Sequence, residues 1–113
     1  SHYEGVGVMG IEVTRAEKII DTLFYNGERK PHMWWDEFEK LLIGAFSSID
    51  KSEGQQVHSD FMRLRILLKK VNADSLSGIT ASINVEISKM PITYTFLQAM
   101  ASYRTAVNQK FPP

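Results

Sequence analysis

Apolar residues recur every three or four positions along most of the chain, which places them on one face of an α-helix. The first stripe predicts a helix that begins at Thr14, because Thr14 and Glu17 have the spacing of a capping box. Asn26 and Gly27 supply a position that tolerates a positive φ, so we expect this helix to end there.

The second stripe contains two adjacent tryptophans and predicts a helix whose first turn holds Pro31, where the missing N–H of proline costs nothing. Its apolar positions fall on one broad face: Trp34, Trp35, Phe38, Leu41, Leu42, Ala45 and Phe46. The polar stretch 47–56 follows it and contains Gly54, which predicts a loop.

Two further helices have clear starting signals. Ser59 is a suitable N-cap for a third helix, which we expect to run to about Asn72. Thr95 and Gln98 have capping-box spacing and predict a last helix, which is expected to stop at residues 112–113, both prolines.

The segment between these two helices carries two competing patterns. Leu76, Ile79, Ile83 and Ile87 have helical spacing, but apolar residues from Ile79 to Ile87 also alternate with polar ones as they do in a strand. The segment is long for a strand, and no convincing partner strand occurs elsewhere. We therefore predict an all-α fold, a single small bundle of about five helices, with a strand over residues 75–90 as the alternative.

A chain of 113 residues, 43% hydrophobic and 23% charged, has the size and balance of one globular domain. Residues 1–13 are glycine-rich and are expected to form a flexible leader, followed by a helical domain over residues 14–113. Thirteen basic residues balance 13 acidic ones, so net charge gives no general attraction to nucleic acid or to an anionic membrane. No apolar run approaches the ~20 residues needed to cross a bilayer. The first residue is not Met, which suggests a domain taken from a longer chain.

No pattern in the sequence predicts catalysis. The chain has no cysteine, which excludes disulfides and cysteine-ligated metals and suits a reducing, cytoplasmic location. Residues 5–10 match the glycine pattern of dinucleotide-binding loops, but too few residues precede them to form the required strand. The carboxylates of Asp36, Glu37 and Glu39 fall on the polar side of their helix, and the three histidines lack the spacing of a helical metal site. We therefore expect no catalytic residue, no metal, no cofactor and no small-molecule substrate.

The third predicted helix carries most of the candidate binding residues. Met62 and Ile66 lie almost opposite its main apolar stripe, and a helix that is apolar on two sides is usually buried on two sides. We expect Met62 and Ile66, together with Trp35 of the second helix, to mediate self-association. The candidates for contact with nucleic acid flank the apolar faces of the third helix on two separate edges: Arg63, Arg65, Lys69 and Lys70.

Several stretches of the sequence resemble the Gag-like capsid-region proteins of copia-type long-terminal-repeat retrotransposons. The resemblance runs from about Arg15 to Pro113, and its strongest pieces are FYNGERKPHMWWDEFEKLL at residues 24–42, QVHSD at 56–60, LRILLKKVNAD at 64–74 and the final NQKFPP. It implies a helical module of a polyprotein that makes repeated weak contacts with its own copies and helps to package the RNA of the element. RNA binding in such proteins often resides in a basic tail or in a zinc knuckle, and a chain without cysteine cannot form the knuckle.

The sequence therefore favours a non-enzymatic, Gag-like assembly domain that forms homo-oligomers and is associated with the packaging of retroelement RNA. The alternative is a nucleic-acid-binding helical domain, of helix-turn-helix or winged-helix type, that contacts RNA or DNA through its third helix. Phe61 and Leu97 depart from the resemblance, since acidic residues are expected at both positions. An apolar residue there either packs inside the fold or forms a contact surface.

Overall fold

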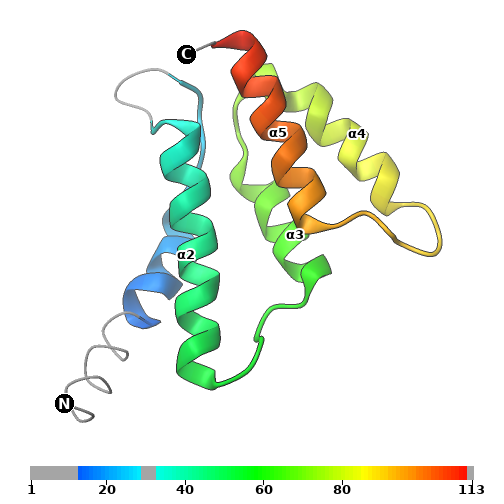
Figure 1. Ribbon diagram of the computed structural model, residues 1–113. Helices are drawn as coiled ribbons and strands as arrows, with labels where there is room; N and C mark the ends of the chain where they lie inside the picture. The colour runs from blue at the N-terminus through cyan, green and yellow to red at the C-terminus, as the bar shows by residue number, and fades with distance from the viewer. Residues whose placement is uncertain (1–12, 29–32, 112–113) are drawn as a thin grey trace.

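The computed structural model describes residues 13–28 and 33–111, and within them it confirms the all-α fold. A helical segment over residues 13–22 comes first. The elements that follow are α2 (Trp35–Glu53), α3 (Asp60–Lys70), the short 3-10 helix η1 (Asp74–Leu76), α4 (Ser77–Ile87) and α5 (Phe96–Lys110) (Figure 1). The described residues contain no strand or sheet, only an isolated bridge between Tyr25 and Val71.

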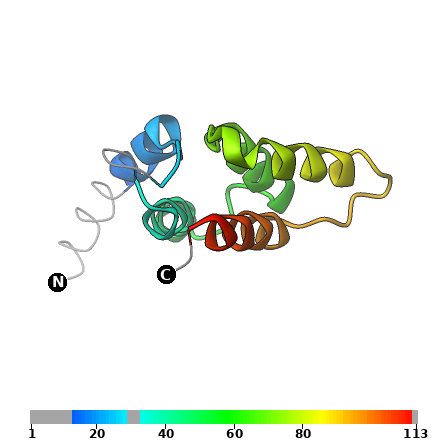
Figure 2. The same cartoon turned by 90° about the horizontal axis from the view of Figure 1, so that it is seen from above.

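The helices form two layers. α2 and α5 run side by side in opposite directions, and the N-terminal helical segment, α3 and α4 lie behind them (Figures 1 and 2). α5 is the central element, since it contacts α2, α3, α4 and η1. An aromatic cluster fills the core near the start of α2, where the Trp35 ring lies 4.9 Å from Tyr25, 5.0 Å from Phe38 and 5.6 Å from Tyr103.

Both of the later capping predictions are confirmed. The Ser59 side chain accepts a hydrogen bond of 3.1 Å from the Met62 amide at the start of α3. At α5, Thr95 Oγ1 accepts from the Gln98 amide at 3.2 Å, and the Gln98 side chain accepts from the Thr95 amide at 2.9 Å. These caps satisfy amides that have no partner inside their helices, and they fix where α3 and α5 begin.

α2 is longer than we predicted, because the first seven residues of the expected loop 47–56 belong to it. Ile49 lies in this stretch and is buried with Ala16 and Ala45, so packing against the N-terminal helical segment extends the helix through a polar sequence. Gly54 ends it with a φ of 71°, and its amide donates to the Asp50 carbonyl. This left-handed position is one that glycine adopts without steric cost.

The start and the end of the first helix both differ from the prediction. Val13 is already helical, so Thr14 lies within the helix and does not begin it. The helix ends at Thr22, before Asn26 and Gly27. The chain then extends along the end of α3, where the Tyr25 amide donates to the Lys70 carbonyl and the Asn72 amide donates to the Tyr25 carbonyl, both at 2.8 Å. These long-range hydrogen bonds, together with the burial of Tyr25, compete with helix continuation.

The fourth segment is helical, and the alternative of a strand is wrong. Ile83 is buried and Ile79 and Ile87 pack partly against the same core, which is the helical stripe, whereas Val85 of the alternating pattern is exposed. Of the other predicted features, the leader residues 1–12, Pro31 and the prolines at 112–113 lie outside the described residues.

Candidate interaction surfaces

Glu28 is a buried carboxylate whose structural role the sequence did not reveal. Its buried carboxylate accepts hydrogen bonds through Oε1 from the Tyr25 hydroxyl at 2.8 Å and from the Trp35 amide at 2.5 Å. The second bond satisfies an amide at the start of α2, a role usually filled by the N-cap residue itself. Burial, followed by the hydrogen bond and the charge of Glu28, raises the pKa of Tyr25 well above its ordinary range.

The carboxylates of Asp36, Glu37 and Glu39 lie in two different environments. Glu39 accepts from Trp35 Nε1 at 3.0 Å and from Arg104 Nε and Nη2 at 3.0 and 2.8 Å, so it connects α2 to α5. The hydrogen bond from Arg104 to Glu39 raises the pKa of the guanidinium. Asp36 and Glu37 are exposed in the first turn of α2, where carboxylates favour the positive end of the helix dipole.

The four basic residues of α3 do not form one cationic surface. Arg63 pairs with Asp50 and lies 5.1 Å from the Phe46 ring. Lys70 is buried, with Nζ 4.6 Å from the Phe24 ring, and Arg65 lies 5.8 Å from the Phe61 ring. Lys69 is exposed. Two of the four are thus committed to contacts within the fold, as expected for long side chains that cover apolar surface.

The three candidates for self-association lie in different environments. Met62 is 49% exposed, on the side of α3 roughly opposite the buried Leu64 and Leu67. Ile66 is partly buried against the core. Trp35 is only 2% exposed and belongs to the aromatic core, so its assignment to a contact surface was wrong. The neighbouring Trp34 is the exposed indole.

The seam between α2 and α5 is fixed at two levels. The Glu39–Arg104 ion pair joins the helices near the start of α2, and an edge-to-face contact of 5.8 Å between Phe46 and Phe96 joins them further along.

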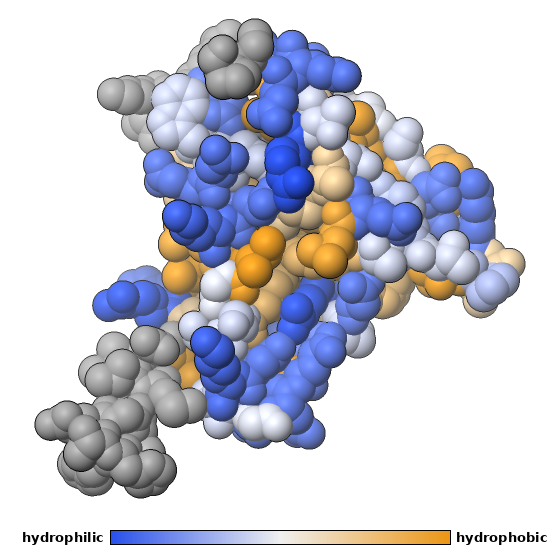
Figure 3. All heavy atoms as spheres, in the orientation of Figure 1, coloured by the Kyte–Doolittle hydropathy of each residue, from blue (hydrophilic) through white to orange (hydrophobic). Residues whose placement is uncertain are grey.

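An apolar patch lies along this seam, and we define it as the seam patch, consisting of Ile43, Leu97 and Ala101. Ile43 follows Glu39 by one turn, and Leu97 precedes Arg104 by two turns of the antiparallel α5. Ile43 is 38% exposed, Leu97 is 68% exposed, and Ala101 is also exposed. Figure 3 shows hydrophobic side chains gathered in the middle of this face between hydrophilic ones. The sequence signal for this patch was the unexpected apolar residue at position 97.

The remaining features of the described residues are the possible metal ligands, His58 and the hydropathy of the helices. No group of three or more potential metal-ligating side chains occurs within residues 13–28 and 33–111. His58 packs against Phe46, with ring centroids 5.1 Å apart, and its Nδ1 is buried without a hydrogen-bond partner. None of the helices in the described ranges has the length and hydropathy of a membrane span.

Comparison of the chain with known protein families, with curated protein sequences and with solved structures found no match.

Proposed function

We propose that this domain is a non-enzymatic assembly module that binds copies of itself, in the manner of the Gag-like capsid-region proteins that its sequence resembles. In this proposal the assembled copies act in the cytoplasm and accompany the packaging of retroelement RNA. The observation that carries the proposal is the seam patch, where Leu97 is 68% exposed on α5 and Ile43 is 38% exposed on the paired α2.

The seam patch suits a contact between proteins because its apolar residues stand on two rigid helices. The Glu39–Arg104 pair and the Phe46–Phe96 contact hold α2 and α5 in fixed register, so little order must be gained on binding. An apolar centre with a charged rim is also the usual arrangement of such interfaces. Glu39 and Arg104 supply that rim at one end of the patch.

An exposed apolar residue on a helix of the other layer favours repeated contacts over a closed pair. Met62 projects from α3, which lies in the layer behind α2 and α5 (Figure 2). Two different surfaces on one chain allow heterologous contacts, which propagate from copy to copy unless their rotation closes a ring. The weak, repeated association expected of a capsid module would follow from such an arrangement.

The alternative of a nucleic-acid-binding domain receives no comparable support. Arg63 and Lys70 are engaged within the fold, which leaves only Arg65 and Lys69 available on α3. We therefore advance self-association as the single proposed function.

The test is the molar mass of the protein measured by light scattering over a wide concentration range at low and moderate salt. We expect the mass to rise with concentration past that of a dimer, because each contact is weak and the series is open. Leu97→Ser and Met62→Ser remove exposed apolar side chains and should each reduce that rise.

Two matched controls separate specific contacts from general loss of hydrophobicity. Val85→Ser and Met90→Ser make similar changes at exposed positions away from both surfaces, and they should leave the concentration dependence unchanged. A mass that stays at monomer or at a closed dimer throughout the range would contradict the proposal. Equal effects of the test and control variants would contradict the assignment of the surfaces.

A further inference from the structure

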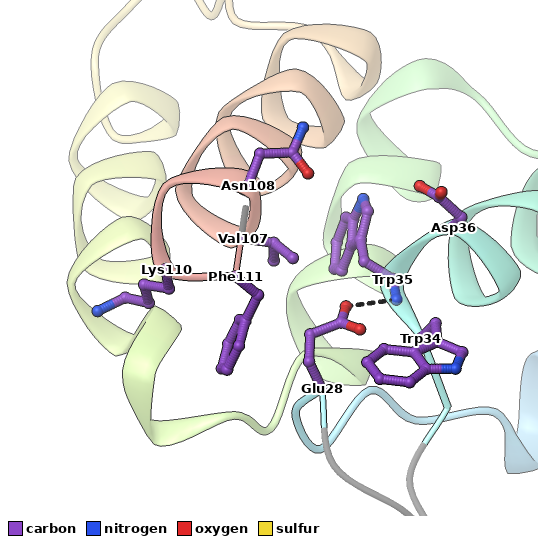
Figure 4. Close-up of a pocket in the computed structure, with 8 residues that line it drawn as sticks. All are labelled: Glu28, Trp34, Trp35, Asp36, Val107, Asn108, Lys110 and Phe111. Carbon is purple, nitrogen blue, oxygen red and sulfur yellow. Dashed lines mark hydrogen bonds between the residues drawn. The ribbon is translucent and has the colours of Figure 1, made fainter. Parts of the chain in front are cut away.

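A groove opens between the start of α2 and the end of α5, at the opposite end of the seam from Leu97. Its volume is about 710 Å³, within the range of sites that hold a small ligand or a short stretch of peptide. Figure 4 shows the side chains that line it, from the first residues of α2, the last residues of α5 and Glu28 in the preceding segment. The seam patch and the groove share no residue.

Aromatic side chains form the walls of this groove. Trp34 is 48% exposed and Phe111 is 43% exposed, and their rings flank the Glu28 carboxylate on two sides (Figure 4). The buried side chains of Trp35 and Val107 lie beneath them. Exposed aromatic faces attract cations through the negative charge of the ring face, in addition to their apolar contact.

The charges at the groove favour a positively charged occupant. Glu28 contributes a buried carboxylate, and within the described residues both of its hydrogen bonds go to Oε1, which leaves Oε2 available. Asp36 adds an exposed carboxylate at the rim. Lys110, the one basic residue among the described residues of the lining, directs its amino group away from the groove (Figure 4). The Glu28 carboxylate therefore lies between two aromatic rings, and Asp36 adds a second carboxylate at the rim that points away from Glu28 (Figure 4).

We propose that this groove binds the guanidinium group of an arginine side chain presented by a peptide partner. A guanidinium is planar, stacks on aromatic rings and donates paired hydrogen bonds to carboxylate oxygens, so it matches each component of the lining. The methylene stem of arginine fits the apolar walls. The groove is larger than one guanidinium, which leaves room for the residues on either side of the arginine. This binding goes beyond the proposed self-association and does not depend on it.

Intrinsic fluorescence offers a direct readout, because the chain has two tryptophans and both line the groove. The probe is the peptide acetyl-Gly-Arg-Gly-amide, titrated at low salt and at a protein concentration at which light scattering reports a monomer. We expect a saturable change in emission. The citrulline peptide has nearly the same shape but no charge, and it should bind at least about tenfold more weakly. The lysine peptide should bind with intermediate affinity, and added salt should weaken binding of the arginine peptide.

Variants test the site residue by residue, with binding followed by NMR chemical-shift changes where a tryptophan is removed. Trp34→Ala should weaken binding about tenfold, and Asp36→Asn about threefold. Glu28→Gln keeps an oxygen that can accept from the Trp35 amide while removing the charge, so it should weaken binding with α2 still capped. Asp36 and Trp34 are exposed, and circular dichroism should confirm that their variants remain folded.

The matched control lies in a second acidic groove near the other end of α2, which Glu17, Asp21 and Glu53 help to line. Glu53→Gln removes one carboxylate there and should leave binding of the arginine peptide unchanged. Weakening by Glu53→Gln in place of Asp36→Asn would move the binding to that second groove and overturn the proposal. Equal affinity for the arginine and citrulline peptides, or no saturable change, would overturn it as well. Each of these results is independent of whether the protein self-associates.

Discussion

At the scale of single residues, Tyr25 shows how one buried hydroxyl connects stability to pH. Its phenol donates to Glu28, and its ring packs edge-to-face on Trp35. Because the pKa of Tyr25 in the folded protein is raised above the ordinary tyrosine value of 10.0, the folded state keeps this proton at pH values where the unfolded chain releases it. The stabilisation is therefore complete below pH 10 and is lost as the pH rises above it. Burial raises the pKa of Tyr103 in the same direction.

Tyr25→Phe should alter both the level and the pH profile of stability. At neutral pH we expect a loss of about 1–2 kcal/mol, because the Glu28 carboxylate loses one of its donors. Above pH 10 the wild-type protein should lose up to about 1.4 kcal/mol more per pH unit than the variant. Urea denaturation at several pH values between 7 and 11 measures both effects. Parallel profiles for the two proteins would show that Tyr25 does not titrate as the folded structure requires.

At the scale of elements, sequence reasoning succeeded where the signal is local. Ser59 and Thr95 begin their helices as predicted, since each cap involves residues only three positions apart. The last turns of α2 and the extended segment around Tyr25 were missed because distant residues determine them. Ile49 packs against Ala16, and the Tyr25 backbone bonds to Lys70, and no local pattern contains either contact.

Gly44 lies inside α2 and Gly54 caps its C-terminal end, and together they provide a paired test of this helix. Gly54 has a φ of 71° at the C-terminal end, so Gly54→Ala should destabilise the protein by about 1–2 kcal/mol. Gly44 lies in the middle of the helix, and a Cβ added there meets no atom within 4 Å, so Gly44→Ala should stabilise it by about 0.5–1 kcal/mol. Thermal or urea unfolding of the two variants measures the difference. Destabilisation by Gly44→Ala would contradict the open space beside this position, and unchanged stability of Gly54→Ala would contradict the left-handed end of α2 at this residue.

At the scale of the whole molecule, the candidate surfaces arise from the antiparallel pairing of α2 with α5. That pairing brings the helix turns that carry Ile43 and Leu97 onto the same seam, and it places Phe111 opposite Trp34 across the groove (Figure 4). These residues are 54 and 77 positions apart in the sequence, so helical periodicity could identify exposed apolar or aromatic residues but could not join them into surfaces. Periodicity also could not distinguish Trp35 from the adjacent Trp34. Both are tryptophans at the start of the same helical stripe, but Trp35 is buried and Trp34 is exposed.

The long-range contacts also predict that the N-terminal segment and the bundle unfold together. The Tyr25 and Asn72 amides donate across the contact between this segment and the end of α3, and Tyr25 is buried beside the aromatic core. Hydrogen exchange reports the free energy of the opening that exposes an amide. For both amides we expect this free energy to lie within about 1 kcal/mol of that for the Leu67 amide in the core of α3, because all three amides are exposed only by global unfolding. The Lys89 amide, in the exposed turn after α4, should exchange much faster through local motion and serves as the control. If the Tyr25 amide instead exchanged as fast as that of Lys89, the segment would open separately. The Glu28 wall of the groove, three residues further along, would then be present only part of the time.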